Sequence, residues 1–231
     1  MRVFLTLILL AWALPATAQQ AADAVQPEAA TAPRDFGWSP AALEALEQRN
    51  AGQPVTAQSE MVAAANPLAV EAGTAILAAG GSAADALVAV QLVLGLVEPQ
   101  SSGLGGGAFL LYYDAETGDV VTLDGRETAP LAATPQLFQD QNGEPLKFFD
   151  AVVGGRSVGT PGTPALLSDA HMRWGRLPWA QLFNDAVALA DGGFTVSPRL
   201  AGLIARDAER LGRFPTTANY FLPNGAPLQA G

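Results

Sequence analysis

The stretch Ser101–Pro130 decides the fold, and it reads SSGLGGGAFLLYYDAETGDVVTLDGRETAP. A glycine-rich loop leads into the apolar run Ala108–Asp114. Because large apolar residues follow one another there without alternation, we expect a strand that is covered on both faces. The cluster Ala115–Gly118 is typical of a turn, and we expect Asp119–Asp124 to return as the second strand of a hairpin.

Two helices are expected before this loop. Asn66 and a proline at the first helical position predict a helix that ends at about Ala79, where a glycine pair follows. Ser82 then caps a helix over Ala83–Val97, in which Asp85 and Gln91 are the only polar residues. A helix without a polar face is buried between layers, so we expect this helix at the centre of the fold.

The other segments carry weaker start and stop signals. We expect a short strand at Met61–Ala65, an irregular segment at Pro130–Asp150, a glycine-dense loop at Gly154–Gly162, and helices at Pro40–Gln48, Thr163–Gly175, Pro178–Asp191 and Ser197–Gly212. Helices that alternate with a buried sheet predict a layered α/β architecture, helix–sheet–sheet–helix or helix–sheet–helix.

Composition excludes several classes of function. The 231 residues are 49% hydrophobic and 15% charged, which is too apolar for a disordered chain. The net charge of -10 disfavours nucleic acid as a partner. There is no cysteine, and His171 is the only histidine, so a thiolate site and a multi-histidine metal centre are excluded. We expect His171 at the surface, near the end of its helix.

The N-terminus has the features of a secretory signal peptide. Arg2 precedes the apolar run Val3–Leu14, and Ala16-Thr17-Ala18 has the small-x-small form that signal peptidase accepts. An uncleaved anchor would need an apolar run of about 20 residues. We therefore expect residues 1–18 to be a signal peptide, 19–58 a linker with one short helix, and 59–231 a folded domain that is secreted or periplasmic.

The glycine loop allows three interpretations. Gly103–Ala108 matches the dinucleotide pattern G-x-G-x-x-[GA], but that motif follows a strand and opens a helix, whereas here a strand follows the loop. A phosphate site is therefore disfavoured. The loop is a tight reversal between buried elements, or a stretch of bare backbone that lines a pocket.

Arg126 is the main candidate binding residue. It follows the second strand in an apolar part of a chain that is poor in cations, so it requires an anion nearby. Its guanidinium would suit a carboxylate ligand, with Glu127 in support, or it would form a structural salt bridge. A second candidate, the threonine pair in Thr216–Tyr220, lies in an expected loop with no base to activate either hydroxyl.

Taken together, these motifs resemble the gamma-glutamyltransferase (glutathione hydrolase) family. The matching stretches occur in the family's order over about Ser59–Gly231. They are Met61–Ala69, Gly80–Ala86, Gly103–Phe109, Asp124–Pro130, Val158–Gly162 and Asp191–Phe194.

The resemblance implies an N-terminal-nucleophile hydrolase fold, a four-layer αββα sandwich that is incomplete in this chain. Family members are exported, cut themselves into two subunits, and use the new N-terminal threonine of the small subunit to transfer or hydrolyse the gamma-glutamyl group of glutathione and its conjugates. Amino acids or peptides are the acceptors. The resemblance assigns the glutamyl alpha-carboxylate to Arg126 and a supporting role to Glu127, with no cofactor and no metal.

One departure from the family is large. The family's Thr-Thr-His-Tyr nucleophile segment is absent, and Thr216–Tyr220 lacks the histidine and comes too early, so we expect no catalytic residue in this chain. We expect the chain to be the N-terminal part of the large subunit, inactive without the small subunit. A related acylase acting on glutaryl or cephalosporin side chains, and a non-catalytic binding module, are the alternatives.

Overall fold

The computed structural model describes residues 39–231, so the expected signal peptide and the first part of the linker lie outside the described residues. The elements in chain order are α2 (Pro40–Asn50), α3 (Pro67–Ala78), α4 (Ala83–Val97), β1 (Ala108–Tyr113), β2 (Val120–Gly125), α5 (Phe148–Val152), the 3-10 helix η2 (Gly155–Ser157), α6 (Thr163–Trp174), the 3-10 helix η3 (Trp179–Phe183), α7 (Asn184–Gly192), α8 (Pro198–Leu211), α9 (Pro215–Phe221) and the 3-10 helix η4 (Pro223–Gly225).

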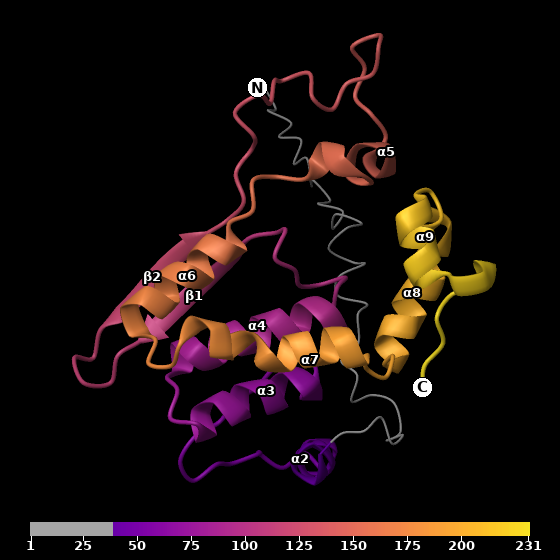
Figure 1. Ribbon diagram of the computed structural model, residues 1–231. Helices are drawn as coiled ribbons and strands as arrows, with labels where there is room; N and C mark the ends of the chain where they lie inside the picture. Colours follow the sequence, from indigo (N-terminus) through magenta and orange to yellow (C-terminus); the bar gives the residue numbers. More distant parts are fainter. Residues whose placement is uncertain (1–38) are drawn as a thin grey trace, which may run out of the picture.

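Helix α4 is the centre of the fold, as its sequence predicts. It packs against α3, α6, α7 and η3, and the core cluster is built around it (Figure 1). Val88 and Val93 are fully buried. Gly73 of α3 lets the two helices approach closely, because a Cβ there would lie 2.6 Å from Cγ2 of Val90.

Local capping explains where the helices begin. Asn66 accepts a hydrogen bond from the backbone of Leu68, and Ser82 and Asp85 form a reciprocal capping box at the start of α4. Ser197 caps α8 by accepting a hydrogen bond from the backbone N–H of Leu200, and a proline occupies the first helical position. The predicted helices at these positions, and the short helix α2 capped by Ser39, are therefore confirmed.

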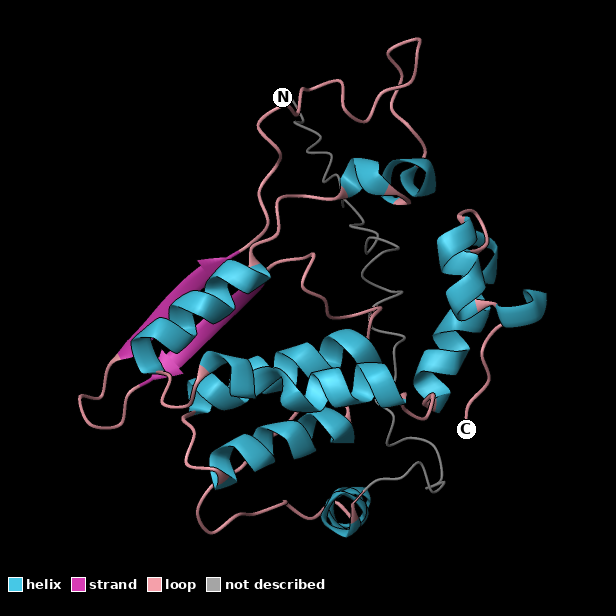
Figure 2. Cartoon of the chain, in the orientation of Figure 1, coloured by secondary structure: helices cyan, strands magenta, loops and turns pink. Residues whose placement is uncertain are grey.

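The hairpin is confirmed, but the prediction that both its faces are covered is wrong for the described chain. One face packs on the core and on α6, which runs along it (Figure 2). The outer face is exposed, and Phe109, Leu111 and Tyr113 are 64, 72 and 64% exposed. Each strand alternates between partly buried and exposed residues, so no helix or sheet of the described residues covers the outer face.

Three further expectations differ from the structure. Met61–Ala65 has no regular secondary structure, and no described strand pairs with it. The expected helix at Pro178–Asp191 divides into η3 and α7. Thr216–Tyr220 lies within helix α9, not in a loop.

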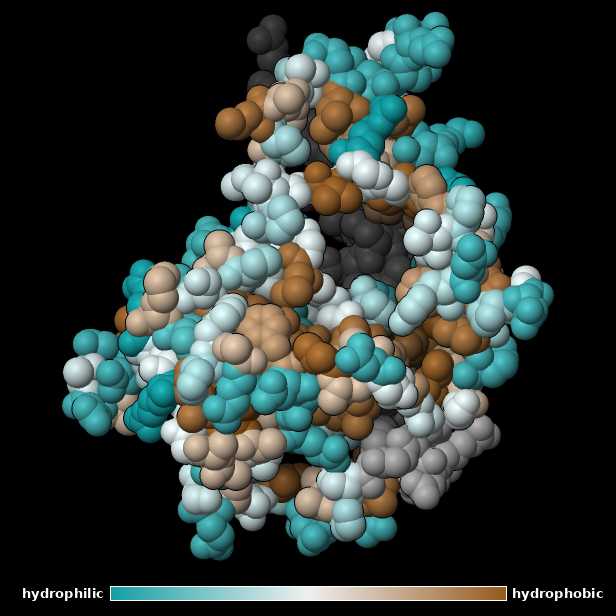
Figure 3. Space-filling view, in the orientation of Figure 1, coloured by the Kyte–Doolittle hydropathy of each residue, from teal (hydrophilic) through white to brown (hydrophobic). Residues whose placement is uncertain are grey.

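The segment between β2 and α6 stands away from the core. Helix α5 has no buried residue, and hydrophobic residues reach the surface over α5 and the loop before it (Figure 3). Leu131, Phe148 and Phe149 are among these exposed residues. Contacts to α8 and to the turn after it restrain the segment, since Cζ of Arg210 lies 4.2 Å from the ring centre of Phe149 and Nη1 of Arg213 lies 3.5 Å from Oδ1 of Asp150.

Asp85 links the start of α4 to the loop after α6. Its Oδ2 accepts hydrogen bonds from the backbone N–H groups of Ser82, Arg176 and Leu177, at 2.9, 2.9 and 3.2 Å. Burial alone would raise the pKa of Asp85, but these hydrogen bonds lower the pKa below its usual value. The buried carboxylate therefore stabilises the fold as an anion.

We predict that Asp85→Asn lowers the free energy of unfolding at pH 7 by about 1–3 kcal/mol, because an amide replaces the charged acceptor. The pKa of Asp85 is about 4 in the unfolded chain and is lower in the folded protein. The stabilisation that the Asp85 carboxylate provides is therefore present at neutral pH and is lost as the pH falls through the lowered pKa. Urea unfolding of the full-length protein at pH 7 and at about pH 3 measures the difference in unfolding free energy between wild type and Asp85→Asn. This difference should be smaller at about pH 3.

Asp169→Asn is the matched control for this prediction. Asp169 pairs with Arg173 on the exposed side of α6, so its loss should change the unfolding free energy by less than about 0.5 kcal/mol. Equal effects of the two substitutions would contradict the role of Asp85.

Candidate functional site

Three motifs that are far apart in the sequence meet at one junction. The glycine loop Ser101–Gly107 lies against the segment Arg126–Thr128, and both touch the loop that precedes α6. Thr128 and Thr160 exchange backbone hydrogen bonds of 3.3 and 2.8 Å. The carbonyl of Gly106 accepts from the N–H groups at positions 162 and 163, at 3.0 and 3.1 Å.

Glycine is required at this junction because the backbones approach so closely. A Cβ on Gly107 would lie 2.1 Å from Oε2 of Glu127 and 2.5 Å from its backbone nitrogen. A Cβ on Gly162 would lie 2.0 Å from the carbonyl oxygen of Gly125. None of the glycines of the loop has a positive φ, so the requirement is for space and not for an unusual conformation.

The other side of the loop lines a pocket of about 490 Å³. Its wall is formed by backbone and small polar groups, which are Gln91, Pro99, Gln100, Ser101, Ser102, Gly103, Gly105, Gly106, Gly107 and Glu127. A Cβ at Gly103 or Gly105 would meet nothing within 4 Å. The loop is therefore both a close backbone contact, where only glycine fits, and a stretch of bare backbone that lines a pocket, as the two remaining interpretations of its sequence proposed.

Arg126 does not line this pocket, but the next residue, Glu127, does. Its side chain is 67% exposed, and its Nε is 3.7 Å from Oε2 of Glu127, which is beyond hydrogen-bond distance. No described residue accepts a hydrogen bond from its guanidinium, whereas its backbone N–H donates to Oδ1 of Asp124 at 2.9 Å. The guanidinium thus forms one long, exposed ion pair with Glu127 and no hydrogen bond to the described residues, and its donors remain available for an anion.

Glu127 connects the exposed guanidinium with the glycine loop. Its carboxylate lies between Arg126 and Gly107, and its side chain is 34% exposed. The backbone of Gly159 also lies close to this side chain, because a Cβ added to Gly159 would be 3.1 Å from Cγ of Glu127. The structure therefore brings the two predicted site residues, Arg126 and Glu127, to one side of the glycine loop.

Several residues at this junction were not predicted from the sequence. Gln91 of α4 donates to Oγ of Ser102 at 2.6 Å, and Glu98 pairs with Arg199 of α8. A polar residue inside an apolar helix was the available signal for Gln91. Nothing local pointed to Arg199, because its partner is 101 residues away in the chain.

The remaining candidates lie away from the junction. His171 is half-buried, not at the surface as expected, because its Nε2 lies 2.9 Å from the carbonyl of Leu177 and 3.6 Å from Oδ1 of Asp85. Within residues 39–231 there is no group of three or more histidine or acidic residues that could hold a metal ion. No helix of that part is long and apolar enough to cross a membrane.

Comparison with known proteins agrees with the motifs. The model of the gamma-glutamyltranspeptidase family matches residues 69–231. The glutathione hydrolase proenzyme of Bacillus subtilis (strain 168) is 44% identical over 171 residues, which are 74% of this chain and 29% of the relative. The acylase ACY 1 proenzyme of Pseudomonas sp. (strain V22) is 38% identical over 184 residues, 78% of this chain and 33% of the relative.

A solved structure shares the fold. The gamma-glutamyltranspeptidase of Helicobacter pylori superposes with a TM-score of 0.72 and 32% sequence identity, over 77% of this chain and 51% of that one. This likeness confirms the expected fold class, an N-terminal-nucleophile hydrolase sandwich that is incomplete in the described residues. The chain spans about a third or less of the length of the curated relatives named above.

We predict that Gly107→Ala lowers the free energy of unfolding by about 1–3 kcal/mol, because the added methyl group meets the backbone of Glu127 and one segment must move. Urea unfolding measures the change. Gly105→Ala is the control, since its Cβ enters open space, and it should be close to neutral. If both variants lost the same free energy of unfolding, the close contact with Glu127 would not be the cause of the destabilisation.

Proposed function

Because the chain belongs to the gamma-glutamyltranspeptidase family, we propose that it forms the N-terminal part of the large subunit of a gamma-glutamyltransferase or glutathione hydrolase. The proposed substrates are glutathione and its gamma-glutamyl conjugates, and the proposed acceptors are water, amino acids or peptides. The relatives that support this proposal are named proenzymes, which agrees with cleavage into two subunits.

The observation that carries the proposal is the exposed guanidinium of Arg126, which pairs loosely with Glu127 and donates no hydrogen bond to a described residue, next to a residue that lines the glycine-rich pocket. A planar guanidinium can hold a carboxylate through two parallel hydrogen bonds. With the alpha-carboxylate of the glutamyl group held by Arg126, the gamma carbonyl is placed in a defined position for attack. Positioning of this kind can lower a reaction barrier by several kcal/mol.

The attacking group is proposed to come from the small subunit. Its N-terminal threonine hydroxyl would attack the gamma carbonyl carbon, and its own alpha-amine would take the proton. The C–N bond of the substrate then breaks, the leaving amine receives that proton, and the glutamyl ester passes to water or to an amino acceptor. This chain contributes the carboxylate site and none of the bond-breaking groups.

We predict that Arg126→Ala in the full-length protein raises KM for a gamma-glutamyl anilide roughly 10- to 100-fold, as expected for the loss of a charged hydrogen-bonded pair. The effect on kcat should be smaller, because the reacting groups are elsewhere. Steady-state kinetics on the purified enzyme measures both constants. Arg173→Ala serves as the control, since Arg173 pairs with Asp169 on the exposed side of α6. An unchanged KM in the Arg126 variant would remove the proposed role.

An acylase is the second candidate, because the acylase ACY 1 proenzyme matches a similar share of the chain. Its substrate would be a glutaryl or cephalosporin-type amide without an alpha-amine. We predict that glutathione is cleaved with a kcat/KM at least about tenfold above that of a glutaryl amide, since both offer a carboxylate to Arg126 but only glutathione carries the alpha-amine that a gamma-glutamyl site would bind. A preference for the glutaryl amide would favour the acylase instead.

We also propose that the protein is exported after cleavage behind Ala18. The support is the charged start, the short apolar run and the small-x-small site in the sequence. N-terminal sequencing of the mature protein is the test, and material that begins at Met1 would exclude cleavage.

A further inference from the structure

A buried ion pair joins the end of α4 to the start of α8. Glu98 is 1% exposed, and the side chain of Arg199 is 16% exposed. Nη1 of Arg199 donates to Oε2 of Glu98. Glu98 is the residue at which the chain leaves α4, where the helix dipole disfavours a negative charge, so the arginine offsets an otherwise unfavourable carboxylate.

The carboxylate of Glu98 is also held by two amide side chains. Asn66, which caps α3, donates to Oε1 at 3.4 Å, and Gln100 donates to Oε2 at 2.5 Å. The pair thus joins the start of α3, the end of α4, the start of α8 and the residue before the glycine loop. A buried carboxylate that is paired and hydrogen-bonded in this way keeps one geometry.

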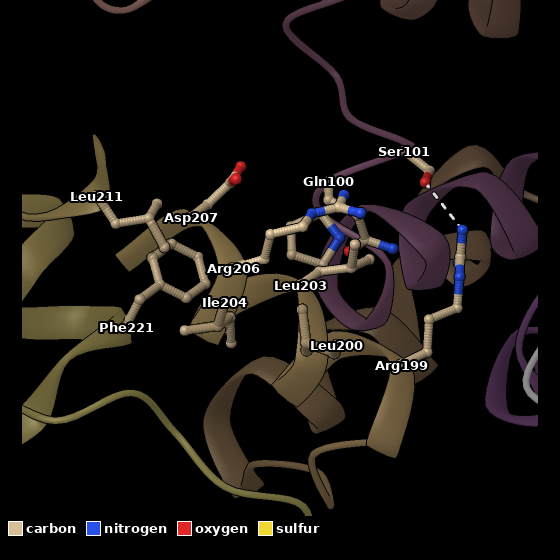
Figure 4. Close-up of a pocket in the computed structure, with 11 residues that line it drawn as sticks. Gln100, Ser101, Arg199, Leu200, Leu203, Ile204, Arg206, Asp207, Leu211 and Phe221 are labelled. Carbon is tan, nitrogen blue, oxygen red and sulfur yellow. Dashed lines mark hydrogen bonds between the residues drawn. The ribbon is translucent and has the colours of Figure 1, made fainter. Parts of the chain in front are cut away.

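The same residue fixes the first turn of the glycine loop. The carbonyl of Glu98 accepts from the backbone N–H groups of Ser101 and Ser102, both at 3.0 Å. Nη2 of Arg199 lies 3.5 Å from Oγ of Ser101, and Figure 4 shows the guanidinium turned toward that hydroxyl. Arg199 therefore reaches both the carboxylate and the turn that the carboxylate supports.

The turn stands between two pockets. Pro99, Gln100 and Ser101 line the pocket of about 490 Å³ beside Glu127 and also a second pocket of about 780 Å³ along α8 (Figure 4). From this turn the loop runs on to Gly107, which is in close contact with Glu127. A shift at Ser101 would therefore be passed along five residues of backbone to the neighbour of Arg126.

We propose that Glu98 and Arg199 are positioning residues that hold the glycine loop against Glu127, so that Arg126 is presented to the carboxylate of the substrate. The pair does not touch substrate. This inference rests on the proposed gamma-glutamyl activity for its kinetic consequence, whereas its effect on the loop can be measured independently of any activity.

The test compares Arg199→Gln, Arg199→Lys and the control Arg206→Gln in the full-length protein. Arg206 lines the same pocket two turns further along α8, and no described residue forms an ion pair with it. Hydrogen–deuterium exchange measures how well the backbone amides of Gln100–Gly107 are protected. Steady-state kinetics with a gamma-glutamyl anilide measures KM, which should rise if Arg126 is no longer held in position.

In Arg199→Gln we expect amide exchange of the loop to increase at least about tenfold and KM to rise about tenfold, with kcat within about threefold of wild type. Arg199→Lys keeps the charge opposite Glu98 and should restore KM to within about threefold. Arg206→Gln should leave both measurements unchanged. Wild-type exchange and KM in Arg199→Gln would overturn the proposal, and so would an equal effect of Arg206→Gln.

Loss of one partner of a buried pair can prevent folding, so a second variant keeps the test decisive. The double variant Glu98→Gln/Arg199→Gln leaves no unpaired buried charge, and we expect the same rise in loop exchange and KM. Wild-type values in a folded double variant would overturn the positioning role. If the wild-type protein does not cleave gamma-glutamyl compounds, the proposed function fails, and the exchange experiment still decides whether the pair holds the loop.

Discussion

The close contact between Gly107 and Glu127 is the constraint on which the rest of the junction depends. No side chain fits between the two backbones, so the glycine loop, the end of β2 and the loop before α6 must lie in one arrangement. Backbone hydrogen bonds from positions 162 and 163 to Gly106 then complete it. Arg126 follows β2 directly and is therefore placed by the backbone, not by side-chain partners of its own.

Helix α4 shows how an apolar helix can also organise polar contacts. Its burial follows from its composition, but its two polar residues and the residue at its C-terminal cap each connect the core to a different segment. Asp85 holds the turn after α6, Gln91 holds Ser102, and Glu98 at its end holds Arg199. Because these groups are buried or half-buried, each is hydrogen-bonded, and each thereby fixes the position of a loop.

The exposed face of the hairpin explains the one large disagreement with the sequence pattern. The run Ala108–Tyr113 carries large apolar residues on both faces, yet α6 and the core cover one of them. Met61–Ala65, which the sequence predicts as a strand, likewise has no described strand beside it. Both features belong to a chain that spans about a third or less of its curated relatives' length. The apolar pattern of a strand reflects which of its faces are covered in the complete fold, and the described residues supply only part of that fold.

The local features of the fold could be predicted from the residue pattern alone. Caps and glycines set the helix ends at Asn66, Ser82 and Ser197, because a capping hydrogen bond reaches only two or three residues along the chain. The pairing of Glu98 with Arg199, the half-burial of His171 and the exposure of Arg126 depend on segments that meet only after folding. Sequence order carries no record of such distances, so these contacts, and with them the geometry of the candidate site, were decided by the tertiary structure.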